Sequence, residues 1–271
     1  MSKISKILVI SSKGGVGKST ISTQIITPYL YIHNSKKPIK YYEFDDENRD
    51  YLSFAASNLS LRKNVQTSNN FLREDIVEIF SKNESLCVDI GGNKTTTLAI
   101  KAFRDSGMIH LVDLVIIPLL DGEQDGINAS AVYSTLKKLS PEIKVLFILN
   151  KVKDIKKLKY QFENYFGDPR EIFSNRYALK TYLKNNDFNN VAVMLDDDVI
   201  KYSRRFGLTI YEIAKQKRNF ISELKKNMDN YSSEQEIKLT SFKNYMDNAS
   251  KDYYNNIIVP IFKKIDKILK K

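Results

Sequence analysis

The chain has 271 residues, of which 42% are hydrophobic and 28% charged, so it is long enough for a folded core and is not an intrinsically disordered chain. It carries 43 lysines and arginines against 32 aspartates and glutamates, and the formal charge of +11 favours an anionic partner, either nucleic acid or a membrane surface. One cysteine, Cys87, excludes an internal disulfide framework, and two histidines make a catalytic zinc site unexpected. We find neither a membrane-spanning run nor a signal peptide, and we expect a cytoplasmic protein.

Short apolar runs alternate with segments of helical periodicity as far as Tyr211. The predicted strands are 7–10, 39–44, 86–90, 111–120, 145–149 and 191–195. The predicted helices between them are 19–33, 126–139, 155–166 and 172–184. Because the apolar runs are continuous rather than alternating, both faces of the sheet should be covered. The sequence therefore predicts an α/β fold with a doubly wound, mostly parallel sheet.

The chain beyond Tyr211 contains no further strand pattern. It has three stretches of helical character, at 212–231, 234–248 and 257–271. We therefore divide the chain into a main α/β domain, residues 1–230, and a C-terminal helical extension, residues 231–271.

A glycine-rich segment, Ser-Ser-Lys-Gly-Gly-Val-Gly-Lys-Ser-Thr, follows the first strand and opens the first helix. Glycines let successive backbone N–H groups surround phosphate oxygens, and a helix N-terminus adds a positive dipole end. In a phosphate loop of this kind Lys18 would bridge the β- and γ-phosphates of ATP, Ser19 would ligate Mg²⁺ and Thr20 would contact the α-phosphate. The alternative is a tight turn without a ligand, but it does not explain two lysines beside a Ser-Thr pair. The predicted loop residues are Gly14, Gly15, Val16, Gly17, Lys18, Ser19 and Thr20.

The loop departs from the strict phosphate-loop pattern, because Ser12 stands where that pattern has its first glycine. The form Lys-Gly-Gly-x-Gly-Lys-Ser resembles the deviant Walker motif of the ParA/MinD family of ATPases. In that family the extra lysine, here Lys13, reaches across an ATP-bound dimer to the partner's nucleotide. The resemblance covers about residues 3–225. It implies a P-loop ATPase domain, ATP and Mg²⁺ as cofactors, a homodimer in the ATP state, and slow hydrolysis stimulated by a partner.

Two carboxylates close the strand 39–44. This segment, Glu-Phe-Asp, resembles the family's Asp-x-Asp-Pro-Gln, and the resemblance implies that Asp45 orients or activates the hydrolytic water, with Lys13 and Lys18 as the other catalytic residues. Glu43 falls on the first aspartate of the family segment, whereas Asp-Glu replaces Pro-Gln after Asp45. The alternative is a solvated acidic turn.

A further carboxylate, Asp89, ends the apolar run Leu-Cys-Val and precedes Gly91 and Gly92. This is the Walker B arrangement, in which the aspartate holds a magnesium-bound water. The two glycines would permit close approach to the γ-phosphate. We expect Cys87 to pack inside the sheet.

The residues expected next to the base of the nucleotide follow two later predicted strands. Asn150 follows the strand 145–149 and resembles the family asparagine that reads the adenine edge, although an ordinary turn residue is the alternative. Asp196 follows the strand 191–195 and resembles the start of the family's nucleotide loop. Leu195 and Thr209 stand where that family has prolines.

Most of the excess positive charge lies in the segments 151–159, 199–226 and 257–271. ParA-like proteins bind DNA non-specifically as ATP dimers through basic residues near the C-terminus, so the resemblance implies DNA as a partner. We expect this basic surface on a different face from the nucleotide, and the alternative is a set of lysine-rich, solvated helix faces. The candidate DNA-binding residues are Arg204, Arg205, Lys215, Lys217 and Arg218.

The last predicted helix carries an apolar stripe beside five lysines. Such a helix either packs on the rest of the protein, which we favour, or lies on anionic lipid as in MinD-like proteins. The stripe consists of Ile257, Ile258, Ile261, Phe262, Ile265, Ile268 and Leu269.

The resemblance implies a ParA-type ATPase that partitions plasmid or chromosomal DNA, associates with the nucleoid when ATP is bound, and is stimulated by a ParB-like, DNA-bound adaptor. Three alternatives stay open: a MinD-like membrane-positioning ATPase, a ParA-type accessory ATPase of a conjugation or secretion system, and a metabolic ligase on the same fold. Lys13 argues against the ligase.

Overall fold

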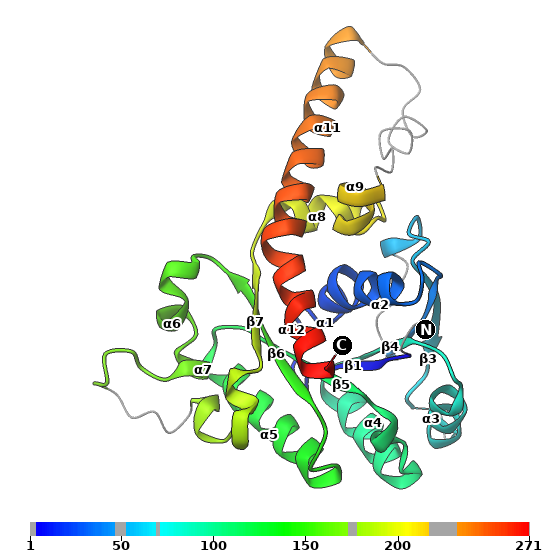
Figure 1. Cartoon of the computed structure of the whole chain (residues 1–271), viewed down its shortest axis with the longest axis vertical. Coiled ribbons are helices and arrows are strands. Elements are labelled where there is room, and N and C mark those ends of the chain that lie inside the picture. The colour runs from blue at the N-terminus through cyan, green and yellow to red at the C-terminus, as the bar shows by residue number, and fades with distance from the viewer. Residues whose placement is uncertain (1–3, 47–52, 69–70, 173–177, 217–231, 271) are drawn as a thin grey trace.

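The central feature of the protein is a seven-stranded parallel sheet (Figure 1). The computed structural model describes residues 4–46, 53–68, 71–172, 178–216 and 232–270. Within them the strand order is β3-β2-β4-β1-β5-β6-β7, and every neighbouring pair is parallel. The strands are β1 (Lys6–Ile10), β2 (Ile39–Phe44), β3 (Ser60–Val65), β4 (Leu86–Ile90), β5 (Leu114–Leu119), β6 (Val145–Val152) and β7 (Val191–Leu195). The predicted fold class, a doubly wound parallel α/β sheet, is confirmed.

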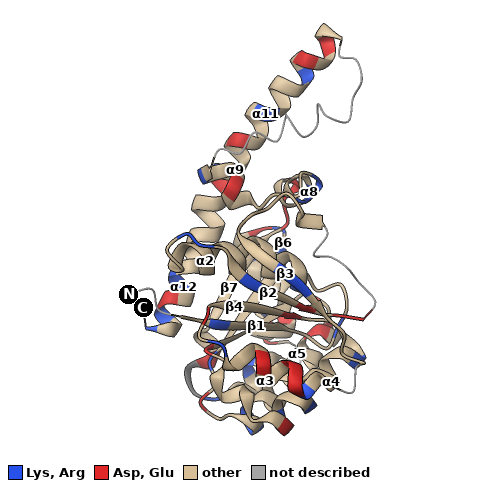
Figure 2. Cartoon of the chain, turned by 90° about the vertical axis from the view of Figure 1, so that its right-hand side faces the viewer, with Lys and Arg blue, Asp and Glu red and all other residues tan. Residues whose placement is uncertain are grey.

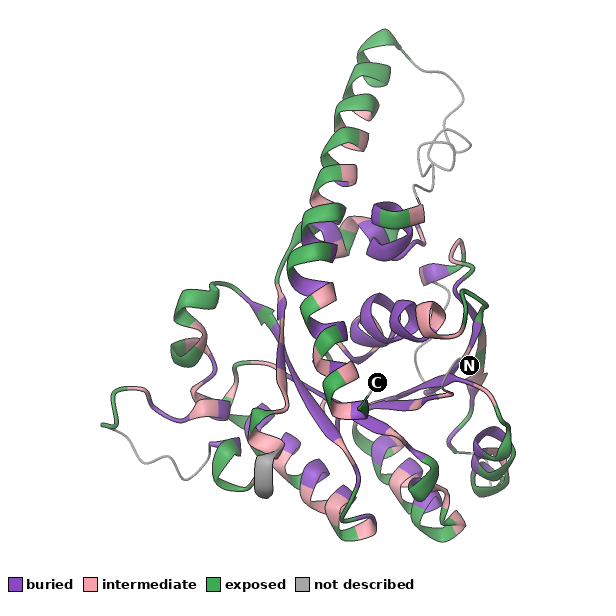
Figure 3. Cartoon of the chain, viewed as in Figure 1, coloured by how far each residue is buried: buried purple, intermediate pink, exposed green. Residues whose placement is uncertain are grey.

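Helices cover both faces of the sheet, and each face has its own hydrophobic core (Figure 3). In β1 the side chains alternate between the two cores: Ile7 and Val9 belong to the first, Leu8 and Ile10 to the second. The first core is covered by α1 (Lys18–Ile21), η1 (Ser22–Ile26), α2 (Thr27–His33), α8 (Asp198–Arg205), α9 (Ile210–Gln216), α11 (Ser233–Tyr253), η8 (Tyr254–Ile258) and α12 (Val259–Leu269). The second is covered by α3 (Leu72–Ser81), α4 (Asn93–Ser106), η3 (Met108–Leu111), α5 (Glu123–Leu139), α7 (Glu163–Phe166) and η6 (Leu179–Thr181). The other short helices among the described residues are η4 (Ile155–Lys157), α6 (Leu158–Gln161) and η7 (Asn185–Asn189).

All six predicted strands are present, but three local predictions were incomplete or wrong. The strand β3 was missed because its polar run Ser-Leu-Arg-Lys-Asn lies at the sheet edge, where exposed positions alternate with buried or half-buried ones. The prediction of a helix over 172–184 is wrong for residues 178–184, which the structure describes and in which the only helical segment is the short η6. The predicted helix 212–231 corresponds to α9 at its start, and residues 217–231 lie outside the described part of the chain.

The C-terminal segment is integrated into the first core. Helix α11 projects from the body at its N-terminal end, where Ser232 and Gln235 form a capping box, and it joins the core from Met246 onward (Figures 1 and 3). In α12 the side chains of Ile261 and Ile265 are at most 1% exposed. The expectation that the apolar stripe packs on the protein is therefore confirmed. Among the described residues, no helix is long and apolar enough to span a membrane.

Candidate nucleotide-binding site

The carboxyl ends of five strands meet around a cavity of about 1000 Å³. In an open parallel sheet this edge is where ligands bind, because loops and helix N-termini converge there. Of the predicted nucleotide residues, Lys13 and Val16 do not line the cavity. Those that line it are Gly14, Gly15, Gly17, Lys18, Ser19, Thr20, Asp45, Asp89, Asn150 and Asp196.

The glycine-rich loop between β1 and α1 has the backbone that a phosphate cradle needs. Gly15 and Gly17 have φ angles of +74° and +92°, which glycine adopts without strain. A Cβ on Gly14 or Gly15 would meet no atom within 4 Å, so space is open on this side of the loop. A Cβ on Gly17 would lie 2.1 Å from Nδ2 of Asn150, so only glycine fits there.

The Lys18 side chain is a cation held inside the cavity. It is 8% exposed, and its Nζ donates a hydrogen bond of 2.9 Å to the carbonyl oxygen of Lys13. Burial lowers the pKa of Lys18, and the nearby carboxylates of Asp89 and Asp45 oppose that shift. An anionic ligand beside Nζ would offset this desolvation, which fits a phosphate.

The two predicted carboxylates enter the cavity from neighbouring strands. Asp89 at the end of β4 pairs in register with Glu43 of β2, and both are 2% exposed. The Tyr41 hydroxyl donates a hydrogen bond of 2.9 Å to Oδ2 of Asp89. The carboxylate of Asp45 lies against Gly91, where an added Cβ would approach Oδ2 to 3.0 Å.

The segment after β4 is joined directly to the glycine-rich loop. The backbone N–H of Asn93 donates to the Ser12 carbonyl at 2.7 Å. The Thr96 hydroxyl lies 2.7 Å from the Gly91 carbonyl oxygen and 3.0 Å from that of Ser11. A ligand that displaces one of these segments must therefore disturb the other.

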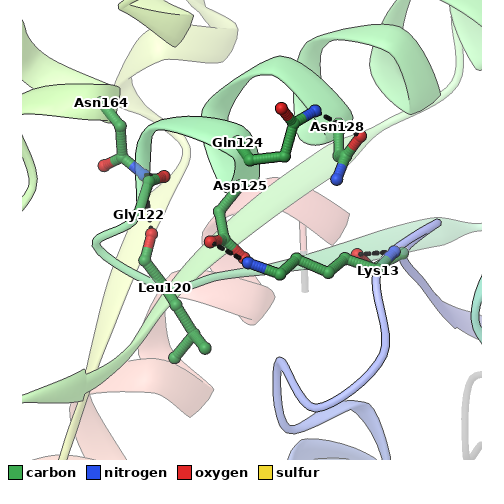
Figure 4. A network of polar contacts seen from close by, with 8 residues as sticks. Lys13, Leu120, Gly122, Gln124, Asp125, Asn128 and Asn164 are labelled. Atoms are coloured by element: carbon green, nitrogen blue, oxygen red, sulfur yellow. Dashed lines mark hydrogen bonds and ion pairs between the residues drawn. The ribbon is translucent and has the colours of Figure 1, made fainter.

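Lys13 points away from the cavity toward helix α5 (Figure 4). Its Nζ lies 2.7 Å from Oδ2 of Asp125, which is buried in the first turn of α5. The other oxygen of Asp125 is buried and has no hydrogen-bond partner among the described residues. The Asn164 amide donates to the Leu120 and Gly122 carbonyls at 2.7 Å each and holds the turn before α5. Sequence reasoning did not single out Asp125, whose one sequence signal is its place in the acidic stretch that follows β5.

The base-contact candidates have different environments. Asn150 is buried, its Nδ2 donates to the Val16 carbonyl at 2.9 Å, and its Oδ1 accepts from the Lys151 N–H at 2.9 Å. Asn150 thus supports the glycine-rich loop. Asp196 is exposed on the cavity wall, and the neighbouring Asp197 caps helix α8 through the Val199 N–H.

Asp46, which stands in place of the family proline, has a structural role. Its carboxylate accepts hydrogen bonds from the Thr67 N–H at 2.5 Å, the Thr67 hydroxyl at 2.9 Å and the Ser68 N–H at 2.9 Å. It thereby joins the end of β2 to the turn after the edge strand β3. Glu47 lies outside the described residues.

The basic candidates are not gathered on a separate face. Arg204 and Arg205 of α8 are exposed and line the same cavity as the glycine-rich loop, together with Lys201. Figure 2 shows basic positions on helix α8, which lies above the sheet in that view. Lys215 lies on α9, with its Nζ 4.9 Å from the centre of the Tyr254 ring. Lys217 and Arg218 lie outside the described part of the chain. The expectation of a different face was therefore wrong for α8, because the loop after β7 turns this helix back over the cavity.

The residues present fit a magnesium ion that arrives with a nucleotide. Within the described part of the chain, no group of three or more His, Cys, Asp or Glu side chains could hold a metal by itself. Mg²⁺ usually retains several waters and binds through one or two protein oxygens plus substrate phosphates. Ser19 and Asp89 supply such oxygens in the cavity that contains Lys18.

A seven-stranded parallel sheet with a glycine-rich loop between β1 and α1 defines the class of P-loop NTPase folds. No family model matches the sequence, and no curated protein does. Among solved structures, the MinD cell division protein of Aquifex aeolicus is similar with a TM-score of 0.50 and 14% identity, over 84% of this chain and 100% of MinD. The predicted resemblance to the ParA/MinD family is thus confirmed at the level of the fold.

Two further solved structures are similar at lower scores. An ATP complex of McdA from Cyanothece has a TM-score of 0.46 and 11% identity, over 86% of this chain and 100% of McdA. A plasmid partition protein from Borrelia burgdorferi has a TM-score of 0.45 and 14% identity, over 75% of this chain and 96% of that protein.

Proposed function

We propose that the chain is a ParA-type ATPase that binds ATP with Mg²⁺, dimerises in that state and positions DNA by hydrolysing the nucleotide. One observation carries the proposal: the ends of five strands meet at one cavity. The glycine-rich loop with Lys18 lines this cavity, and so do the carboxylates of Asp45 and Asp89. The phosphate loop and Lys18 would bind the phosphates, Asp45 would orient the attacking water and Asp89 would hold a magnesium-bound water. Asn150 and Asp196 would lie next to the base.

Dimerisation is proposed through Lys13. In the present structure this lysine forms an ion pair with Asp125 of its own chain, so reaching a partner's nucleotide requires that ion pair to break. Asp125 is buried, whereas the Lys13 side chain is 38% exposed. In the proposed scheme Asp125 therefore keeps its place in α5 while the Lys13 side chain rotates away from it toward solvent. The proposal therefore gives Lys13 two positions, one on Asp125, as in this structure, and one across the dimer.

Replacing Lys13 by alanine should leave ATP binding intact and abolish ATP-dependent dimerisation, because the cavity does not contain Lys13. Analytical ultracentrifugation with and without Mg-ATP measures this, and isothermal titration measures ATP affinity. The control is Asp125→Asn, which removes the intrachain partner and should dimerise at least as readily as the wild type. A Lys13→Ala protein that still dimerises on ATP would contradict the scheme.

DNA binding is supported by the exposure of Lys201, Arg204 and Arg205, which line the cavity, and by the net charge of +11. We expect the affinity of the ATP form for DNA to fall steeply with salt, because phosphate contacts release counterions. The double variant Arg204→Gln and Arg205→Gln should reduce the slope of log K against log salt by about 2. Arg104→Gln, an exposed change on α4, is the control.

Filter binding at several salt concentrations decides this prediction. Salt-independent binding would remove the electrostatic argument. An ATP affinity that falls in the α8 double variant, with DNA affinity unchanged, would assign these arginines to the nucleotide instead.

The partner and location follow from the proposed role. A ParB-like adaptor bound to DNA would stimulate hydrolysis, and the ATP dimer would associate with the nucleoid. The same chemistry would serve an accessory ATPase of a transfer or secretion system. The MinD-like membrane alternative has less support, because the apolar stripe it requires is packed in the first core.

A further inference from the structure

A hydrogen bond beneath the proposed magnesium site involves a residue that the proposed chemistry does not use. Tyr41 of β2 is buried, and its hydroxyl lies 2.9 Å from Oδ2 of Asp89. Tyr41 pairs in register with Cys87, two positions before Asp89, so all three side chains emerge on the same face of the sheet. The tyrosine ring therefore extends along the sheet toward its carboxyl edge and ends at the carboxylate.

The direction of this hydrogen bond follows from the chemistry of the two groups. An ionised carboxylate has no hydrogen to donate and accepts only, whereas a phenol carries an O–H. The Tyr41 hydroxyl therefore donates and the Asp89 carboxylate accepts. An aliphatic side chain could fill this space but could not hold the carboxylate in one rotation.

Arg62 supports Tyr41 from the edge strand β3. The two residues pair in register, and the Arg62 guanidinium lies 4.6 Å from the centre of the Tyr41 ring and 5.3 Å from that of Phe54. None of its three nitrogens has a hydrogen-bond partner among the described residues, although all are buried. A guanidinium in such a place is stabilised by the aromatic faces it contacts. A cation over the ring also draws electron density from the phenol and makes its hydroxyl a stronger donor.

We propose that Tyr41 is a positioning residue for Asp89, with its hydroxyl fixing the carboxylate rotation that a magnesium-bound water requires and Arg62 strengthening that hydroxyl as a donor. The inference rests on the proposed function, since it concerns the Mg²⁺ that accompanies ATP. Groups that orient the metal's own ligands affect metal affinity without touching the metal.

The test separates metal affinity from nucleotide affinity. Fluorescent mant-ATP is titrated into each protein in excess Mg²⁺ and in EDTA, and the ratio of the two dissociation constants gives the gain due to the metal. Tyr41→Phe keeps the ring and loses only the hydroxyl. In this variant the gain due to the metal should fall about tenfold, while the dissociation constant measured in EDTA stays as in the wild type. The matched control is Tyr42→Phe, which removes a hydroxyl from the next residue on the opposite face and should change neither value.

Arg62 is tested by a double-mutant cycle with Tyr41. Arg62→Met should reduce the magnesium gain in the wild-type background and have no further effect in Tyr41→Phe, because it acts through the phenol. Equal effects in both backgrounds would overturn the role of Arg62.

Failure of the inference can be distinguished from failure of the proposed function. A wild type without any magnesium-dependent gain in mant-ATP affinity would overturn the proposed function. A wild type with that gain and a Tyr41→Phe protein with the same gain would overturn the positioning role alone. Equal losses in Mg²⁺ and EDTA would also overturn it, because they would make Tyr41 a general packing residue.

Discussion

A chain that ends at Ile258, and so lacks helix α12, should fail to fold. The helix contributes buried apolar side chains to the first core, and each is expected to contribute about 2–4 kcal/mol. Their sum, on the order of 10 kcal/mol, matches the entire stability of a typical domain. The side chains concerned are Ile261, Phe262, Ile265 and Leu269.

A graded variant makes this prediction measurable. Ile265→Ala should lower the free energy of unfolding by about 3 kcal/mol, because Ile265 is fully buried and its removal leaves a cavity. Lys263→Ala, an exposed position on the same helix, should change it by less than about 0.5 kcal/mol. Urea unfolding followed by circular dichroism compares the three proteins.

The same variants test the lipid alternative. If Ile265→Ala unfolded like the wild type but no longer sedimented with anionic vesicles, the apolar stripe would be a membrane-binding face. The contacts of α12 argue otherwise: Tyr29 of α2 donates a hydrogen bond of 2.8 Å to Asp266, and its ring packs at 5.4 Å from that of Phe262.

Replacing Gly17 by alanine should reduce ATP affinity by more than about 100-fold, because it strains the loop and displaces Asn150. The φ angle of +92° disfavours any L side chain, and the new Cβ would lie 2.1 Å from Nδ2 of Asn150. Asn150 is held at both of its polar atoms, so moving it breaks its hydrogen bond to the Val16 carbonyl. The loop would then lose its support beneath the phosphate cradle.

Gly107→Ala is the matched control for this substitution. Gly107 also has a positive φ, +72°, but a Cβ there would meet nothing within 4 Å. We expect a stability loss of about 1 kcal/mol from backbone strain and an unchanged ATP affinity. Titration calorimetry and urea unfolding on both variants measure the difference. Normal ATP binding by Gly17→Ala would show that this loop is not the nucleotide site.

Prediction from sequence succeeded where the relevant residues are neighbours along the chain. The glycine-rich loop lies between a strand and a helix whose patterns are continuous, and Asp89 is the next-to-last residue of the buried strand β4. Strand ends of a parallel sheet converge on one edge, so placing these residues in one cavity required only the strand assignments.

Prediction failed where local pattern and final environment differ. The edge strand β3 shows no apolar run, because only one neighbouring strand and part of one face cover it. The periodicity of 172–184 indicated a helix, yet its described part forms only a single short turn. Short local preferences are weak, and tertiary packing overrides them.

The sequence by itself determined the fold class, the glycine-rich loop and the carboxylates that line the same cavity, because those depend on spacing within single strand–loop–helix units. Only the tertiary structure decided the partners of these groups. Lys13 meets Asp125 across 112 residues of chain, Tyr41 meets Asp89 from a neighbouring strand, and α8 turns its arginines toward the nucleotide cavity rather than away from it. Such pairings depend on how strands order themselves and on how helices pack over the sheet, and no periodicity in one segment encodes which distant side chain it will meet.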